Sequence, residues 1–144
     1  MKSKIALIAL MLCVPAAIFA ADGQPVLSRN HTCQVTVPAN WTVDATFGMA
    51  TSPDKKVSLV VSSPKQISSF DELKQTAPTV YKNDKVTKQS ASEFQMEGSS
   101  INDKPNVYRV IPAGGAIFCI VDVDYQSGTV EDARKIAESL KAVK

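Results

Sequence analysis

Two cysteines far apart in the sequence constrain this chain more than any other feature. Cys33 and Cys119 are the only cysteines after the N-terminal apolar run, which contains the third, Cys13. An even number of cysteines in an exported chain favours a disulfide, and two cysteines allow only one intramolecular pairing. The bond would close a loop of about 87 residues, worth roughly 4–5 kcal/mol in the chain-entropy model. The alternative is two free thiols in the core.

Residues 1–20 have the three-part pattern of a secretory signal. A short basic start precedes the uncharged and mostly apolar residues 5–19, and small residues then lead into polar sequence. We expect cleavage near Ala20 and a periplasmic or secreted bacterial protein. The alternative is a membrane anchor, but the run contains Pro15 and is shorter than the roughly 20 residues of a bilayer span. We therefore expect no stable membrane insertion after cleavage.

Loss of the signal also changes the charge balance. The chain has 16 Lys and Arg against 14 Asp and Glu, and two of the lysines lie within residues 1–20. A mature chain of about 124 residues, one ordinary domain in length, would be neutral, which argues against a nucleic-acid partner. His31 is the only histidine, which argues against a multi-histidine metal site and against Ser-His or Cys-His catalysis. We expect no cofactor.

Apolar patterning predicts mostly strands in the mature chain. Residues 21–31 lack periodicity and are expected to form a flexible N-terminal segment. Strands are predicted at residues 32–37, 41–45, 47–51, 57–62, 107–111 and 116–125, the last being the longest, with two short strands inside 86–98. Turn residues separate them at Ser52–Lys55 and at Pro112–Gly115.

Two amphipathic helices complete the pattern. A capping box beginning at Ser69 predicts a first helix over residues 70–81, which Pro78 should kink or end early. A second helix, capped by the Thr129 side chain, has an apolar stripe that extends to Leu140. Because short connections between neighbouring strands favour antiparallel pairing, we expect a single α+β domain, with an antiparallel β-sheet flanked by helices.

Several segments of this domain resemble the PsbP-like superfamily. They are Cys33-Gln-Val-Thr-Val-Pro-Ala-Asn-Trp41, the Ser52-Pro53-Asp54 turn, the helix start Ser69-Phe-Asp-Glu-Leu73, the strand Tyr108-Arg-Val110, the strand ending at Tyr125, and the helix with Ile136-Ala-Glu-Ser-Leu140. The superfamily includes the extrinsic photosystem II subunit PsbP, a small Ran-binding nuclear-import factor and periplasmic proteins of the DcrB type. The resemblance implies an α/β/α sandwich over residues 32–144 and proteins that bind other proteins or act as assembly factors. It carries over no catalytic residue.

Two carboxylates are the strongest candidates for chemistry. Asp122 and Asp124 share one face of a predicted strand, where they could chelate a hard cation or divide acid and base roles. The simpler interpretation is a solvated strand end, with an ion pair to a basic residue such as Arg109. A calcium site usually gathers six or more oxygens, which favours this simpler interpretation.

A basic cluster and the single tryptophan are candidates for partner binding. Lys82, Lys85 and Lys88 could meet an acidic protein or a phospholipid surface, or could belong to an ordinary solvated loop. Trp41 is either a core residue or a binding anchor, and burial is the simpler expectation.

These features lead us to expect an exported, non-enzymatic protein that binds a protein or peptide partner, for example in envelope assembly or stress. One alternative is a small-molecule or lipid carrier with a cleft between the sheet and the first helix. Another is a hydrolase with a carboxylate site at Asp122 and Asp124. A broad exposed apolar patch would favour the binder, a closed apolar cavity the carrier, and carboxylates converging in a cleft the enzyme.

Overall fold

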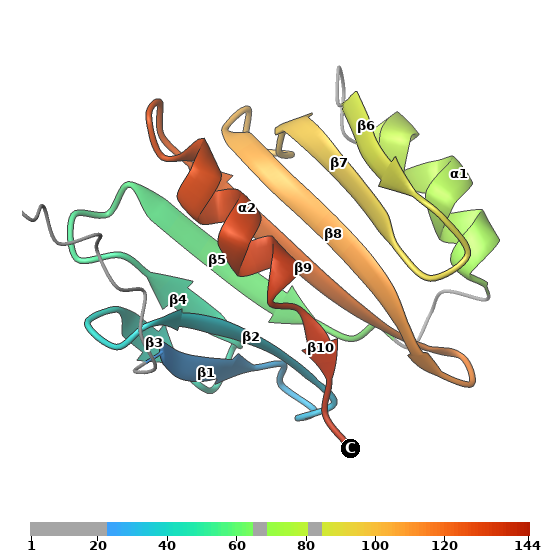
Figure 1. Cartoon of the computed structure of the whole chain (residues 1–144), viewed down its shortest axis with the longest axis horizontal. Coiled ribbons are helices and arrows are strands. Elements are labelled where there is room, and N and C mark those ends of the chain that lie inside the picture. The colour runs from blue at the N-terminus through green and yellow to red at the C-terminus, as the bar shows by residue number, and fades with distance from the viewer. Residues whose placement is uncertain (1–22, 65–68, 81–84) are drawn as a thin grey trace, which may run out of the picture.

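A seven-stranded antiparallel sheet forms the centre of the computed structural model, which describes residues 23–64, 69–80 and 85–144 (Figure 1). The sheet order is β3-β4-β5-β9-β8-β7-β6. Its strands are β3 (Thr42–Asp44), β4 (Met49–Thr51), β5 (Val57–Ser62), β6 (Lys85–Gln89), β7 (Phe94–Ser99), β8 (Pro105–Gly114) and β9 (Ile117–Tyr125). The expected signal at residues 1–20 and the candidate Lys82 lie outside the described residues.

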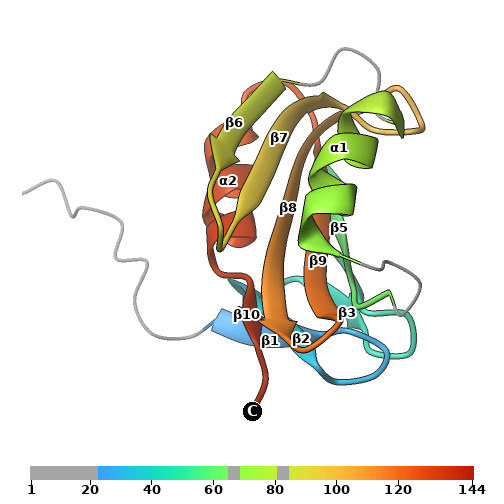
Figure 2. The same cartoon turned by 90° about the vertical axis from the view of Figure 1, so that its right-hand side faces the viewer.

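A smaller sheet and two helices cover the faces of the large sheet. The small sheet has the order β1-β2-β10 and consists of β1 (Gly23–Leu27), β2 (Cys33–Pro38) and β10 (Lys141–Ala142). The helices, α1 (Phe70–Val80) and α2 (Val130–Glu138), lie on opposite faces of the large sheet (Figure 2). This layered arrangement confirms the predicted single α+β domain. No helix in the described ranges is both long enough and apolar enough to span a bilayer.

The larger apolar core lies on the α2 face of the large sheet. Alternation along β2, β5 and β9 turns every second side chain toward it, including Val35, Val61 and Val121, all of them buried. The buried face of α2, with Ala133 and Ile136, packs against these strands. The small sheet, α2 and the large sheet therefore share one core.

A separate core lies under α1 on the other face. Leu73 and Ala77 pack on side chains from β7, β8 and the start of β9, and the Phe70 ring stacks on Phe118 with centroids 6.0 Å apart. The Ser69 hydroxyl accepts a hydrogen bond from the Glu72 backbone N–H at 3.0 Å, as expected of a helix N-cap. α1 thus covers the part of this face formed by β7, β8 and the start of β9, and leaves β3, β4 and β5 open.

The predicted disulfide joins Cys33 in β2 to Cys119 in β9, with 5.4 Å between their Cα atoms. Both cysteines are fully buried in the larger core. The bond therefore links the small sheet to the centre of the large one.

The expectation of a flexible segment over residues 21–31 is wrong from Gly23 onward. β1 pairs antiparallel with β2, placing Val26 opposite Val35, and Val26 is fully buried. Because Gly23 and Pro25 interrupt the apolar alternation, the strand has no clear pattern of its own. Its pairing with β2 supplies the order.

The expected turn at Pro112–Gly115 is also wrong in its extent. β8 continues to Gly114 through a shift in register between Pro112 and Gly114, and the positive φ values of Gly114 and Gly115 turn the chain there. β8 is therefore ten residues long and β9 nine, so β9 is not the longest strand.

The end of α1 and the start of α2 differ from expectation. α1 does not end early near Ala77 but continues to Val80, because Pro78 lies in its last turn and removes only one backbone donor there. At the start of α2 the Thr129 side chain makes no capping bond. Its hydroxyl instead donates to the Gln126 carbonyl oxygen at 2.7 Å.

Candidate functional site

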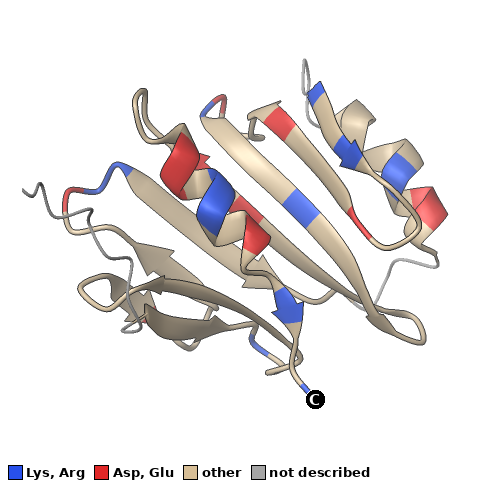
Figure 3. Cartoon of the chain, in the orientation of Figure 1, with Lys and Arg blue, Asp and Glu red and all other residues tan. Residues whose placement is uncertain are grey.

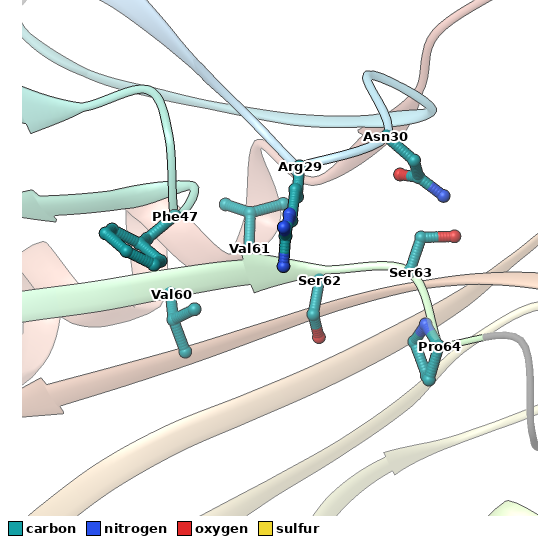
Figure 4. A pocket seen from close by; sticks show the side chains of 8 residues that line it. All are labelled: Arg29, Asn30, Phe47, Val60, Val61, Ser62, Ser63 and Pro64. Carbon is teal, nitrogen blue, oxygen red and sulfur yellow. The ribbon is translucent and has the colours of Figure 1, made fainter.

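Three segments that are distant in the sequence meet beside the end of β5 and form an open groove of about 650 Å³ (Figure 4). The segments are the β1–β2 loop, the β3–β4 turn and the end of β5. The residues lining the groove are Arg29, Asn30, Phe47, Val60, Val61, Ser62, Ser63 and Pro64. We call it the Arg29 groove. Its volume lies within the range of ligand pockets in proteins.

Gly48 holds the three segments together. It has a φ of +65°, and a Cβ at this position would lie 2.8 Å from the carbonyl oxygens of both Leu27 and Val61. The Val61 N–H donates to the Gly48 carbonyl oxygen at 2.8 Å. Only glycine combines this backbone conformation with such close contact, so the β3–β4 turn is fixed between the end of β1 and β5.

The turn presents Phe47, whose exposed fraction is 57%. The Asp44 carboxylate stabilises the turn by accepting a hydrogen bond from the Thr46 backbone N–H at 3.0 Å. Met49 and Val60 lie directly opposite each other on β4 and β5, with exposed fractions of 44% and 37%. We call Phe47, Met49 and Val60 the apolar patch. It lies on the part of the sheet that α1 leaves open.

The polar side of the groove comes from the β1–β2 loop. Asn30 Oδ1 accepts hydrogen bonds from the hydroxyls of Ser28 and Thr32, both at 2.8 Å. This fixes the orientation of the amide, and within the described ranges its Nδ2 group donates to no acceptor. Arg29 is exposed, and no described carboxylate lies within ion-pair distance of it.

Close to this loop lies the disulfide. Ser28 and Cys33 close the loop through two bonds: the Ser28 N–H donates to the Cys33 carbonyl oxygen at 2.9 Å, and the Cys33 N–H donates to Ser28 Oγ at 3.0 Å. Because Cys33 is bonded to Cys119 on β9, the loop carrying Arg29 is anchored to the large sheet.

The lining residues define what the groove can bind. They include one cation, Arg29, and no carboxylate, while Asn30, Ser62 and Ser63 add side-chain donors. Phe47 and Val60 provide an apolar wall beside these donors (Figure 4). Among the described lining residues there is no carboxylate and no histidine.

Neither carboxylate candidate from the sequence lines this groove. Asp122 Oδ1 accepts a hydrogen bond from Asn106 Nδ2 at 2.7 Å. Asp124 lies opposite Asn106 in the β8–β9 pairing, and burial raises the pKa of its carboxyl, while the Ser100 hydroxyl and Lys104 lower it. In the described ranges no three His, Cys, Asp or Glu side chains come together as a metal site.

The suggested ion pair to Arg109 is absent because Arg109 points to the other face of the sheet. Alternation along β8 places it on the same face as Val107, a residue of the larger core. Its guanidinium pairs with Glu93 at 2.9 Å.

The other sequence candidates lie elsewhere in the fold. Lys85 and Lys88 belong to the edge strand β6, and Lys88 pairs with Glu138 of α2 at 3.0 Å. Trp41 is half-buried against the larger core. The sequence analysis missed Arg29 and Phe47, because the first lay in a segment expected to be flexible and the second in a predicted strand.

No protein-family model matches the chain, and a search of curated proteins finds no significant match. Among solved structures, the chain is similar to cyanobacterial PsbP (CyanoP) from Synechocystis sp. PCC 6803, determined in solution. The TM-score is 0.55 at 10% sequence identity, and the match covers 92% of this chain and 99% of the other. The chain therefore has a PsbP-like fold. At this identity the likeness extends to the fold alone.

Proposed function

We propose that this chain is an exported, non-enzymatic protein that binds a protein or peptide partner through the Arg29 groove and the apolar patch. The observation that carries the proposal is the exposed Phe47, which a crowded Gly48 holds in place beside an open groove. Large apolar side chains that are exposed together and held in a fixed geometry are typical of recognition surfaces. The buried disulfide supports export, because such bonds persist in oxidising compartments.

The two other function classes have less support. A carrier would use a cleft under α1, but there Leu73 and Ala77 pack directly on the sheet, and neither residue lines the groove. A hydrolase would need its carboxylates in a cleft, and neither Asp122 nor Asp124 lines the groove.

Site-specific photo-crosslinking in the native envelope tests the proposal. A photoreactive residue replaces Phe47 in one variant and Ile101 in a control variant, since Ile101 is 71% exposed in the β7–β8 turn and does not line the groove. We expect one defined partner to crosslink from position 47 and not from position 101.

Truncation variants complete the test. Phe47→Ala and Val60→Ala should lose the partner, whereas Ile101→Ala should retain it. The free energy of unfolding of all three variants should be within about 0.5 kcal/mol of the wild-type value, because exposed side chains contribute little to stability. Equal crosslinking from positions 47 and 101, or full partner recovery by Phe47→Ala, would exclude the groove as the binding surface.

A further inference from the structure

We infer that the Arg29 groove recognises a peptide segment in which a carboxylate side chain lies next to a large apolar side chain. The inference rests on the proposed function and adds the chemistry of the partner. Three properties of the groove carry it: its donors, the charge around it, and the order in which its polar and apolar groups are arranged.

Within residues 23–64, 69–80 and 85–144, neither Arg29 nor Asn30 Nδ2 donates to an acceptor. Asn30 Oδ1 is occupied by two hydroxyls, which leaves Nδ2 as a second donor of the groove besides the exposed Arg29 guanidinium. In Figure 4 the Asn30 amide nitrogen is on the side turned away from Arg29. A guanidinium presents several N–H groups in a planar fork that matches a carboxylate. The ligand that satisfies this set is an acceptor with negative charge.

No carboxylate among the described residues forms an ion pair with Arg29. Charged residues gather on α2 and on the β6–β7 side of the molecule, whereas strands β1 to β5 carry few, and the turn between β4 and β5 carries Asp54, Lys55 and Lys56 (Figure 3). Asp44, the acidic residue of β3, is absent from the groove lining and is bonded to the Thr46 N–H. The positive charge of Arg29 therefore remains available to a partner.

The arrangement of the lining residues places the two parts of the ligand. Figure 4 shows the Arg29 side chain over the end of β5, between Phe47 on one side and Asn30 with Ser63 on the other. A carboxylate bound by Arg29 would lie near the middle of the groove. The apolar neighbour would then contact Phe47 and Val60.

Strand addition is a less suitable mode of recognition for this fold. In the large sheet the edge strand β3 has only three residues, and the opposite edge, β6, has a register irregularity between Val86 and Lys88. In the small sheet the edge strand β10 has two residues, and the other edge, β1, contains Pro25. Short edges, bulges and lysines all hinder pairing with another chain. Recognition by side chains in the groove is therefore favoured over main-chain pairing.

Selection from a random heptapeptide library displayed on phage tests the inference. The oxidised wild-type protein should enrich peptides with Asp or Glu beside an aromatic or aliphatic residue. The Ile101→Ala control should enrich the same set. Arg29→Glu should lose the acidic preference, and Phe47→Ala should lose the apolar one.

Titration of one selected peptide then measures the contribution of Arg29. Arg29→Glu removes the hydrogen-bonded charge partner of the peptide carboxylate. We expect this variant to bind the peptide at least about tenfold more weakly than the wild type does. Exchanging the acid of the peptide for Lys should restore binding to Arg29→Glu and abolish binding to the wild type. The wild-type affinity should fall as salt rises, because the pair is partly exposed.

The possible failures are distinguishable. Selected peptides that depend on Phe47 but carry no acid would overturn the carboxylate and leave the proposed function standing. Peptides that bind all variants equally would overturn both. Dodecanoate and the free peptide can also be compared as competitors of the bound peptide. If dodecanoate displaces the peptide at a lower concentration than the free peptide does, the groove binds a fatty acid, and the peptide ligand is overturned.

Discussion

The two faces of the seven-stranded sheet differ in how they are covered. On one face α2 and the small sheet close a continuous apolar core that contains the disulfide. On the other face α1 covers only the part formed by β7, β8 and the start of β9, and the open part carries the apolar patch. The covered face therefore contains the larger apolar core, and the open part of the other face carries the surface that we propose for recognition.

Buried polar groups lie on both faces. On the covered face, Arg134 of α2 makes a two-point contact with Glu97 of β7, at 2.8 and 2.7 Å, and this contact lowers the pKa of the Glu97 carboxyl. Four buried polar atoms have no hydrogen-bond partner in the described ranges: Gln95 Oε1 and Arg109 Nε on the covered face, and Asn106 Oδ1 and Asp124 Oδ1 on the other. Unsatisfied buried polar atoms reduce stability, and both faces contain them, so the two faces differ in apolar rather than in polar packing.

Removal of the disulfide should have the largest effect, because the bond joins the small sheet to the covered face. We expect Cys33→Ser/Cys119→Ser to lower the free energy of unfolding by about 2–5 kcal/mol, measured by urea denaturation. The groove should also bind its peptide more weakly, since Cys33 anchors the loop that carries Arg29.

Reduction provides the matched control. Dithiothreitol should destabilise the wild type by a similar amount and leave the double variant unchanged. Two reactive thiols per chain in unreduced, denatured wild-type protein would show that the bond does not form, and the stability of the covered face would then need another source.

Gly48→Ala should have the next largest effect, because Gly48 is where the covered core meets the groove. We expect a loss of about 2–4 kcal/mol from the left-handed backbone and the clash with two carbonyl oxygens. Gly115→Ala is the matched control, since Gly115 also has a positive φ, +58°, but nothing lies within 4 Å of its missing Cβ. It should cost only about 1–2 kcal/mol.

Binding separates the two glycines further. Gly48→Ala should weaken peptide binding in proportion to the displacement of Phe47, while Gly115→Ala should leave the affinity unchanged. Equal losses of stability in both variants would mean that the close contact at Gly48 relaxes easily. The groove would then be less rigid than its geometry indicates.

The covered face was largely predictable from the sequence, and the groove was not. Alternation in residues 32–37 and 116–125 predicts the buried faces of β2 and β9 and places both cysteines on them. Such periodicity is a local signal, because the alternation of apolar and polar residues is visible within a single segment of the sequence. By contrast, Arg29, Phe47 and Ser63 come from three segments, and only their non-local packing around Gly48 brings them together. The sequence analysis missed β1 for the same reason, because this strand is ordered by its antiparallel pairing with β2.

The smallest expected effect concerns Asp124 on the less covered face. Burial raises the pKa of its carboxyl above the ordinary value of 3.8, so the folded chain keeps this proton to a higher pH than the unfolded chain. The contribution of Asp124 to stability therefore falls as the pH rises from about 3.8 through the folded pKa, and stays low at neutral pH. Asn at this position cannot ionise, and its amide could donate to the unpaired Asn106 Oδ1 opposite. We expect Asp124→Asn to raise the free energy of unfolding by about 0.5–1 kcal/mol at pH 7 and by less at pH ~3.

Asp122→Asn is the control and should gain no stability, because Asp122 already accepts a bond from Asn106. A loss of stability in Asp124→Asn at pH 7 would instead mean that the ionised carboxylate is needed, which would revive the cation or hydrolase interpretation of this face.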